Sequence, residues 1–345
     1  MANTRNILLG LLVSASGGAL CAWIKTPLPW MIGPLVGMAI FNFSGARLTA
    51  PPLGREAGQL LIAVTLGLYF TPAVAREVWG SASVLLAAAF GAILIGFAAS
   101  RVLARFAKID PATAFFASVP GGATEMAILG ERFDAAVDKV AVAHSLRILI
   151  VVCTIPVLLT LADVHGGDIY RPVLVLFSWK GLLALFGVAA VGGVIFSNIG
   201  FPNPWMMGPL IATIAITASG TELSAMSGLL TNVGQVLLGC ALGARFSRSF
   251  LSDAPRFVAA VVGCIVLMML MSTAMAFGLA KAADIFFPSM VLAAAPGGIA
   301  EMSITARTLQ LGVALVTAAH VTRVLVIVSS TLPVYRLLTR LSSGR

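Results

Sequence analysis

"VPGGATEMAILG", residues 119–130, and "APGGIAEMSITA", residues 295–306, each break an apolar run with Pro-Gly-Gly and then place a glutamate after the break. In a bilayer, such a break frees backbone groups that need hydrogen bonds, and the carboxylate must be solvated, paired or protonated. Irregular backbone at membrane depth is tolerated only where protein or a water-filled cavity covers it. The two stretches therefore predict a covered polar site inside a membrane protein.

The rest of the chain has the composition of a helical membrane protein. Of its 345 residues, 59% are hydrophobic and 10% are charged, whereas a soluble protein carries about 25% charged residues. Apolar stretches such as 83–100 and 257–280 approach or exceed the roughly 20 residues with which a helix crosses a bilayer. Transmembrane strands would alternate apolar and polar residues, which these stretches do not. We predict an all-α, polytopic integral membrane protein.

The net charge of +9 comes from basic residues that are scattered singly between apolar segments. This distribution is typical of loop residues that orient membrane helices, whereas a nucleic-acid-binding surface would be a contiguous patch. The lipid bilayer is therefore an expected partner, and nucleic acid is not.

The chain is a tandem duplication. "PLPWMIGPL" at 27–35 and "PNPWMMGPL" at 202–210 are identical at seven of nine positions. "HSLR" at 144–147 and "HVTR" at 320–323 follow in the same order, at nearly the same offset. Internal repeats of this kind are common in transporters. We predict two homologous transmembrane halves, residues 1–170 and 171–345.

The number of crossings decides how the halves are related. The first half has five other apolar segments, at roughly 7–24, 29–44, 57–72, 82–104 and 140–160. If the Pro-Gly-Gly stretch re-enters, each half has five spans and the repeats are inverted, whereas a crossing stretch gives six spans and parallel repeats. Basic residues collect on the cytoplasmic side of bacterial membrane proteins. The re-entrant arrangement places 14 of them on one side and 6 on the other, against 12 and 8 for the crossing arrangement.

This count favours inverted repeats with both termini cytoplasmic, in the bacterial inner membrane. Arg55 and Arg245 belong to the cytoplasmic set and are counted there as loop charges. The predicted substrate- or ion-binding residues come from the two breaks: Pro120, Gly121, Gly122, Thr124, Glu125, Pro296, Gly297, Gly298 and Glu301.

A half-helix that starts after Gly122 or Gly298 would point its N-terminal N–H groups at a cavity, which suits an anionic group. Thr124 adds a hydroxyl beside Glu125, while Ala300 leaves Glu301 without one. The first break is therefore the better candidate for binding a polar substrate, and the second for a proton or structural role.

Four further polar residues lie in the last apolar segments of the two halves, two in each. His144 and Arg147 share one helix face at i, i+3 spacing, and His320 and Arg323 repeat the arrangement. An unpaired arginine at that depth is costly, so the glutamates are the expected partners. Two interpretations remain open: a structural Glu–Arg pair that locks each break to its neighbouring helix, or a carboxylate that couples proton or ion movement.

The "PWM-x-GP" motif favours a structural role over substrate contact. Tryptophan is typical of the membrane interface, and proline and glycine permit kinks or close helix packing. Gln59 and Gln235, each inside an apolar run, are expected to form hydrogen bonds between helices. The motif residues are Trp30, Gly33, Pro34, Trp205, Gly208 and Pro209.

The duplicated order PWM-x-GP, PGG-x-x-EM and H-x-x-R resembles the AbrB-type family of membrane proteins of Gram-negative bacteria, over nearly the whole chain. Members of that family are labelled as regulators of the expression of another gene or as ammonia monooxygenase. They are unrelated to the small DNA-binding AbrB regulators. The resemblance extends more distantly to inverted-repeat secondary transporters, in which broken segments line the substrate and ion sites.

Three functions compete. An ion-coupled secondary transporter of a small solute, driven by H⁺ or Na⁺, is favoured by the duplication, the paired breaks and the intramembrane charges. The basic residues and half-helix N-termini favour an anionic solute. A membrane regulator without transport is the alternative. An oxygenase is the least favoured, since it needs a metal cluster and the chain has only three histidines, His144, His165 and His320. We therefore expect no enzymatic activity, metal or cofactor.

Overall fold

The computed structural model describes residues 4–166, 177–247 and 255–343, and gives the backbone alone for Ala123, Thr124 and residues 331–343. These ranges contain fifteen helices and no strand, which confirms the all-α prediction. Those of the first half are α1 (Thr4–Trp23), α2 (Pro29–Phe43), α3 (Gly54–Gly67), α4 (Pro72–Gly80), α5 (Ala82–Ala107), α6 (Pro111–Ser118), α7 (Ala123–Glu131) and α8 (Val137–Leu161). Those of the second are α9 (Trp179–Asn198), α10 (Pro204–Ala218), α11 (Gly228–Gly243), α13 (Pro255–Ala283), α14 (Phe287–Ala294), α15 (Ile299–Thr308) and α16 (Val313–Ser343).

Six helices are long and apolar enough to cross a membrane: α1, α5, α8, α9, α13 and residues 313–330 of α16. Helices α2, α10 and α11 are apolar but shorter. The chain thus has the helices of a multi-pass membrane protein. The predicted segment at 57–72 ends early, because the chain bends by 91° between α3 and α4. Pro72 begins α4, and the Thr71 hydroxyl caps it by accepting a hydrogen bond from the Val74 N–H.

The helices of the second half begin at a nearly constant distance from those of the first. Thr4 and Trp179, which begin α1 and α9, are 175 residues apart (179 − 4), and Val137 and Val313, which begin α8 and α16, are 176 apart (313 − 137). The predicted boundary between the halves, at residues 170 and 171, lies outside the described residues.

Corresponding helices of the two halves pack against each other in opposite directions. In the pair α3 and α11, Thr65 contacts Thr231 with 3.2 Å between the hydroxyl oxygens, while a Cβ on Gly58 would meet the backbone of Leu238. In α5 and α13, the Cys264 thiol lies 3.7 Å from the Ala99 carbonyl, and Arg256 reaches the carbonyl of Phe106. Antiparallel packing of equivalent helices is what an inverted repeat requires.

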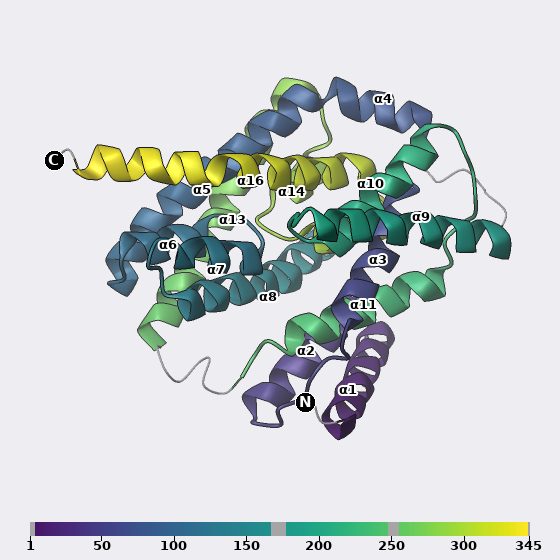
Figure 1. Cartoon of the computed structure of the whole chain (residues 1–345), viewed down its shortest axis with the longest axis horizontal. Coiled ribbons are helices and arrows are strands. Elements are labelled where there is room, and N and C mark those ends of the chain that lie inside the picture. Colours follow the sequence, from purple (N-terminus) through teal and green to yellow (C-terminus); the bar gives the residue numbers. More distant parts are fainter. Residues whose placement is uncertain (1–3, 167–176, 248–254, 344–345) are drawn as a thin grey trace.

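The helices pack most extensively within two groups, which stand side by side in Figure 1. The six-helix group consists of α1, α2, α3, α9, α10 and α11, on the right of the view. The hairpin group consists of α5 to α8 and α13 to α16, on the left and in the centre. Fewer contacts join the groups, mainly from α15 and α16 to α3.

The PWM-x-GP motif holds the six-helix group together through close helix packing. A Cβ on Gly17 of α1 would lie 2.6 Å from the carbonyl oxygen of Gly33 in α2, and a Cβ on Gly18 would lie 2.7 Å from the Trp30 ring. In the second half, a Cβ on Gly192 of α9 would lie 2.6 Å from the carbonyl oxygen of Gly208 in α10, and a Cβ on Gly193 would lie 2.7 Å from the Trp205 ring. Pro34 and Pro209 are buried inside α2 and α10. Each tryptophan thus packs over a glycine of the preceding helix, so the motif lies where these helices are in close contact.

Candidate functional site

Each Pro-Gly-Gly break is the tip of a hairpin of two short helices. In the first, the Thr113 hydroxyl near the start of α6 accepts a hydrogen bond from the Ala136 N–H, 2.7 Å away and just beyond the end of α7. In the second, the Ser289 hydroxyl of α14 accepts one from the Gly312 N–H at 3.3 Å. The chain therefore returns to the end from which it started, which supports the re-entrant arrangement.

Both half-helices begin where the sequence predicts. Gly122 precedes the first residue of α7 and Gly298 precedes the first residue of α15, both in extended backbone. Proline supplies no N–H, and the turn residues form no helix ladder, so carbonyl groups at each tip lack helical partners. The tip therefore needs donors from elsewhere.

Two buried arginines supply those donors. Arg147 on α8 donates to the carbonyls of Val119 and Gly121, at 3.3 and 3.2 Å. Arg323 on α16 donates to the equivalent carbonyls of Ala295, at 2.6 Å, and Gly297. Neither arginine forms an ion pair with a glutamate among the described residues. The expected lock between break and neighbouring helix is present, but the arginines bind loop carbonyls instead of Glu125 and Glu301.

The two histidines bind the short helix that precedes each tip, α6 in the first hairpin and α14 in the second. His144 is fully buried, and its Nε2 lies 2.9 Å from the Phe116 carbonyl while its Nδ1 lies 2.9 Å from Nη2 of Arg147. Since the guanidinium can only donate, Nδ1 accepts and the proton sits on Nε2, which leaves the ring neutral. His320 contacts the Leu292 carbonyl in the same way, but its Nδ1 has no hydrogen-bond partner.

The glutamates lie in the first turn of α7 and α15, where a carboxylate is favoured by the helix dipole. Each folds back over the tip, since a Cβ on Gly122 or Gly298 would overlap the carboxylate of Glu125 or Glu301. Glycine is therefore required at both positions for the carboxylate to lie there.

The two glutamates differ in what holds them. An Oε1 atom of Glu125 accepts a hydrogen bond from the backbone N–H of Asn203 at 3.2 Å. The Asn203 side-chain oxygen in turn accepts from Arg55 at 2.9 Å and from Gln59 at 3.1 Å. Leu28, which occupies the equivalent position in the first half, cannot accept side-chain hydrogen bonds. Gln59 thus forms the expected interhelical bond, while Gln235 reaches only Asn232 of its own helix.

Both tips open on a shared cavity of about 100 Å³ between the two groups of helices. Its charged lining residues are Arg55, Arg147, Arg245, Arg323 and Glu301. The charge of Glu301, which is 7% exposed, interacts with those of Arg55, Arg245 and Arg323. Glu125 is half-buried beside the cavity, where its charge acts on Arg245. The predicted residues that line the cavity are Pro120, Gly121, Gly122, Gly297, Gly298, Glu301, Arg147 and Arg323.

Two of the predicted substrate- or ion-binding residues do not line the cavity: Pro296 directly precedes the lining residue Gly297 in the chain, and Glu125 lies beside the cavity. The Thr124 side chain lies outside the described residues. Glu301, not Glu125, is therefore the acid at the cavity wall, although the sequence favoured the first break as the polar one. A second cavity, of about 180 Å³, lies at the opposite end of α3, lined by residues that include Thr65, Tyr69 and Arg307.

Sequence reasoning missed Arg55, Arg245 and Asn203 as site residues. The two arginines were counted as loop charges, yet Arg55 lies in the first turn of α3 and Arg245 just beyond α11, at the same end of this antiparallel pair. Asn203 was detectable as the one polar residue among the two positions at which "PLPWMIGPL" and "PNPWMMGPL" differ.

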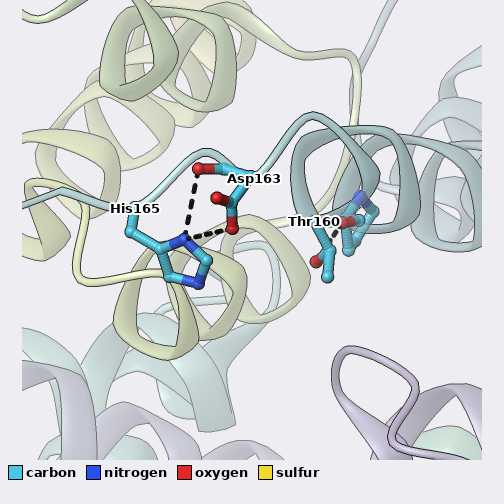
Figure 2. Close-up of polar contacts among 4 residues, drawn as sticks. Thr160, Asp163 and His165 are labelled. Atoms are coloured by element: carbon cyan, nitrogen blue, oxygen red, sulfur yellow. Dashed lines mark hydrogen bonds and ion pairs between the residues drawn. The ribbon is translucent and has the colours of Figure 1, made fainter.

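The third histidine lies away from this cavity. Figure 2 shows His165 after the end of α8, with its Nδ1 3.3 Å from a carboxylate oxygen of Asp163 and 3.2 Å from the Asp163 carbonyl. Both side chains of this pair are exposed. No three His, Cys, Asp or Glu side chains of the described residues lie close enough together to hold a metal ion.

Comparison with known proteins gives three matches. The model of a family described as "Transition state regulatory protein AbrB" matches residues 30–339. A Bacillus subtilis protein named "Uncharacterized protein YhjN" is 27% identical over 95% of this chain and 92% of its own length. An Escherichia coli protein named "Putative regulator AbrB" is 21% identical over 87% of both chains. No solved structure matches.

Proposed function

Since this chain belongs to the AbrB family and folds as a multi-pass helical protein, we propose that it is an ion-coupled secondary transporter of a small, anionic solute. The observation that carries the proposal is the meeting of two hairpin tips at one charged cavity. In secondary transporters, broken helices from two repeats converge at the substrate site.

The division into two groups of helices supports the same proposal. The cavity lies between the six-helix group and the hairpin group, and a second cavity lies at the other end of α3. Transporters expose one site alternately to the two sides by moving one bundle against another. A hairpin group that shifts along α3 and α11 would open first one cavity and then the other.

Coupling would use the glutamates, because a carboxylate within the membrane can bind and release H⁺ or bind Na⁺. An imposed ion gradient should therefore drive uptake. Solutes whose levels differ between a deletion strain and an overexpressing strain would be offered, radiolabelled, to proteoliposomes that contain the purified chain. We expect uptake that needs a pH or Na⁺ gradient and that falls at least about tenfold in Glu301→Gln, which removes a charge used in the coupled step.

Folded protein that takes up none of these solutes under either gradient would contradict transport. The alternative is a membrane regulator without transport, which the printed name of the Escherichia coli relative favours. The two differ in Glu301→Gln: a regulator that does not transport should keep its effect on gene expression in this variant. An oxygenase remains the least favoured function, since Glu301 is the only His, Cys, Asp or Glu side chain among the described residues that line the cavity, and a metal centre needs several such ligands.

We further propose that the halves are inverted, with both termini in the cytoplasm of a bacterial cell whose inner membrane holds the chain. The first hairpin would then open to the cytoplasm and the second to the opposite side. Single cysteines at Arg132 and Arg307, in a chain whose four native cysteines are replaced, should be labelled by an impermeant maleimide from opposite sides. Labelling of both from the same side would rule out inversion.

A further inference from the structure

The cavity carries more positive charge than its own residues balance. Four arginines line it, and Glu301 is the one carboxylate among the described lining residues. Glu125, the nearest other carboxylate, is held by the Asn203 N–H. Buried charges are costly unless they are paired, so an arrangement with several unbalanced guanidinium groups calls for an anion.

Two of the four arginines are already committed to the protein. Arg147 and Arg323 hold the carbonyls of the hairpin tips, and their Nε atoms are buried without a hydrogen-bond partner. Arg55 and Arg245 are different. Arg55 makes one bond to Asn203, and the Arg245 side chain has no hydrogen bond or ion pair among the described residues. These two half-buried arginines therefore have donors left for a ligand.

The size of the cavity limits what it can hold. Its volume of about 100 Å³ is well below the roughly 300–1,000 Å³ of pockets for drug-sized ligands. An arginine pair recognises planar or tetrahedral oxyanions through parallel N–H donors. The room and the donors together suit a small carboxylate or phosphate and leave no space for a lipid with its acyl chains.

We propose that Arg55 and Arg245 bind one small carboxylate or phosphate anion in this cavity, in competition with the ionised Glu301 carboxylate. The inference deepens the proposed transport function by naming its substrate class and the residues that bind it. Glu301 is the competitor because its charge already interacts with both of these arginines.

The competition links anion binding to a proton. An anion beside Glu301 repels the ionised carboxylate, so binding favours the protonated form. The bound state then holds more protons on average than the free state, and affinity rises as pH falls. The charges that face Glu301 come from Arg55 on α3, Arg245 beyond α11 and Arg323 on α16, with Arg147 on α8 across the cavity. The charge of Arg323 also acts on His320, and that of Glu125 acts on Arg245.

The second glutamate offers a matched control. Glu125 has the same place in its hairpin, but the Asn203 N–H holds its carboxylate, and it does not line the cavity. Anion binding should therefore remain dependent on pH when Glu125 is neutralised. Arg307, in the cavity at the opposite end of α3, is the control for loss of a basic residue.

The test is equilibrium binding of succinate, acetate and inorganic phosphate to the full chain in detergent, by calorimetry at pH 5.5 and 7.5. We expect at least one of these anions to bind, more tightly at the lower pH. Arg245→Gln should weaken binding by roughly tenfold to a hundredfold, the value of one hydrogen bond to a charged group. Glu301→Gln should bind more tightly at pH 7.5 and lose the pH dependence. Glu125→Gln also removes a charge that acts on Arg245, so its affinity can change, but it should keep the pH dependence. Arg307→Gln should resemble the unchanged chain.

Several results would overturn the proposal. These are no binding of any of the three anions to the unchanged chain and to Glu301→Gln, binding unaffected by Arg245→Gln, or pH dependence retained in Glu301→Gln. Stabilisation by phosphatidylglycerol micelles that depends on Arg245, with none by the soluble anions, would also contradict it. If Arg245→Gln fails to fold, Arg245→Lys and the Glu301→Gln arm still decide. Binding in detergent needs no transport, so failure here and failure of uptake in proteoliposomes are separate results.

Discussion

Replacing Arg323 by glutamine is expected to lower the free energy of unfolding by about 2–6 kcal/mol, because two buried carbonyls lose their donors at about 1–3 kcal/mol each. The carbonyls of Ala295 and Gly297 lie at the second hairpin tip, where neither accepts a helical hydrogen bond. Glutamine is too short to reach both carbonyls from α16. Arg147→Gln should act in the same direction but cost less, because the Val119 carbonyl keeps a hydrogen bond from the Gly121 N–H at 2.8 Å and only the Gly121 carbonyl loses its donor.

The measurement is thermal and denaturant-induced unfolding of the purified chain in detergent, with Arg307→Gln as the control for loss of a positive charge. The double change Glu301→Gln/Arg323→Gln separates two explanations. If the arginine served mainly to pair with the glutamate, removing both charges should recover most of the lost stability. Because Arg323 instead binds loop carbonyls, we expect the double variant to remain destabilised. Recovery to within about 1 kcal/mol of the unchanged chain would contradict this role.

Gly192→Ala is expected to destabilise the chain by about 1–3 kcal/mol or more, the usual cost of overpacking a close contact. A Cβ at this position of α9 would lie 2.6 Å from the Gly208 carbonyl oxygen and 2.9 Å from its carbon. Both atoms belong to the backbone of α10, so the clash can be relieved only by moving the helices apart. That movement would also lift the Trp205 ring from Gly193.

The same helix provides the control. Gly187 has no atom within 4 Å of an added Cβ, so Gly187→Ala should be neutral or stabilising by up to about 1 kcal/mol through helix propensity. Melting temperatures of the two variants in one detergent give the comparison. Equal stability of Gly192→Ala and Gly187→Ala would show that α9 and α10 are not packed this closely.

The sequence predicted those features that depend on local pattern. Proline followed by paired glycines and an acid gave the half-helices that begin after Gly122 and Gly298, and repeated motifs gave matched sets of helices. The i, i+3 spacing correctly placed His144 and Arg147 on one buried face. These features are readable because each is fixed by neighbours within a few residues.

Partners distant in the chain could not be predicted in this way. Arginine was paired with glutamate because opposite charges attract, but the freed carbonyls at the tip compete for the same donors and lie within reach. Arg55 and Arg245 are 190 residues apart (245 − 55), and only the antiparallel packing of α3 and α11 brings them to one end of the cavity. The first break was predicted to be the better polar site because Thr124 is next to Glu125 in the chain. That argument could not include the distant Asn203, whose N–H binds the Glu125 carboxylate.

The hydrogen bond from the Asn203 N–H to Glu125 affects which conformation of the molecule is more populated. It joins the six-helix group to the first hairpin, and among the described residues the backbone N–H of Leu28 makes no matching bond to Glu301. A hydrogen bond to a charged group contributes about 1.5–3 kcal/mol, which corresponds to a population ratio of roughly ten to more than a hundred between two states. Two conformations related by the pseudo-symmetry would otherwise be equally populated. A transporter built in this way would rest mostly in the conformation in which this one interhelical bond is formed, and so would face one side of the membrane for most of the time.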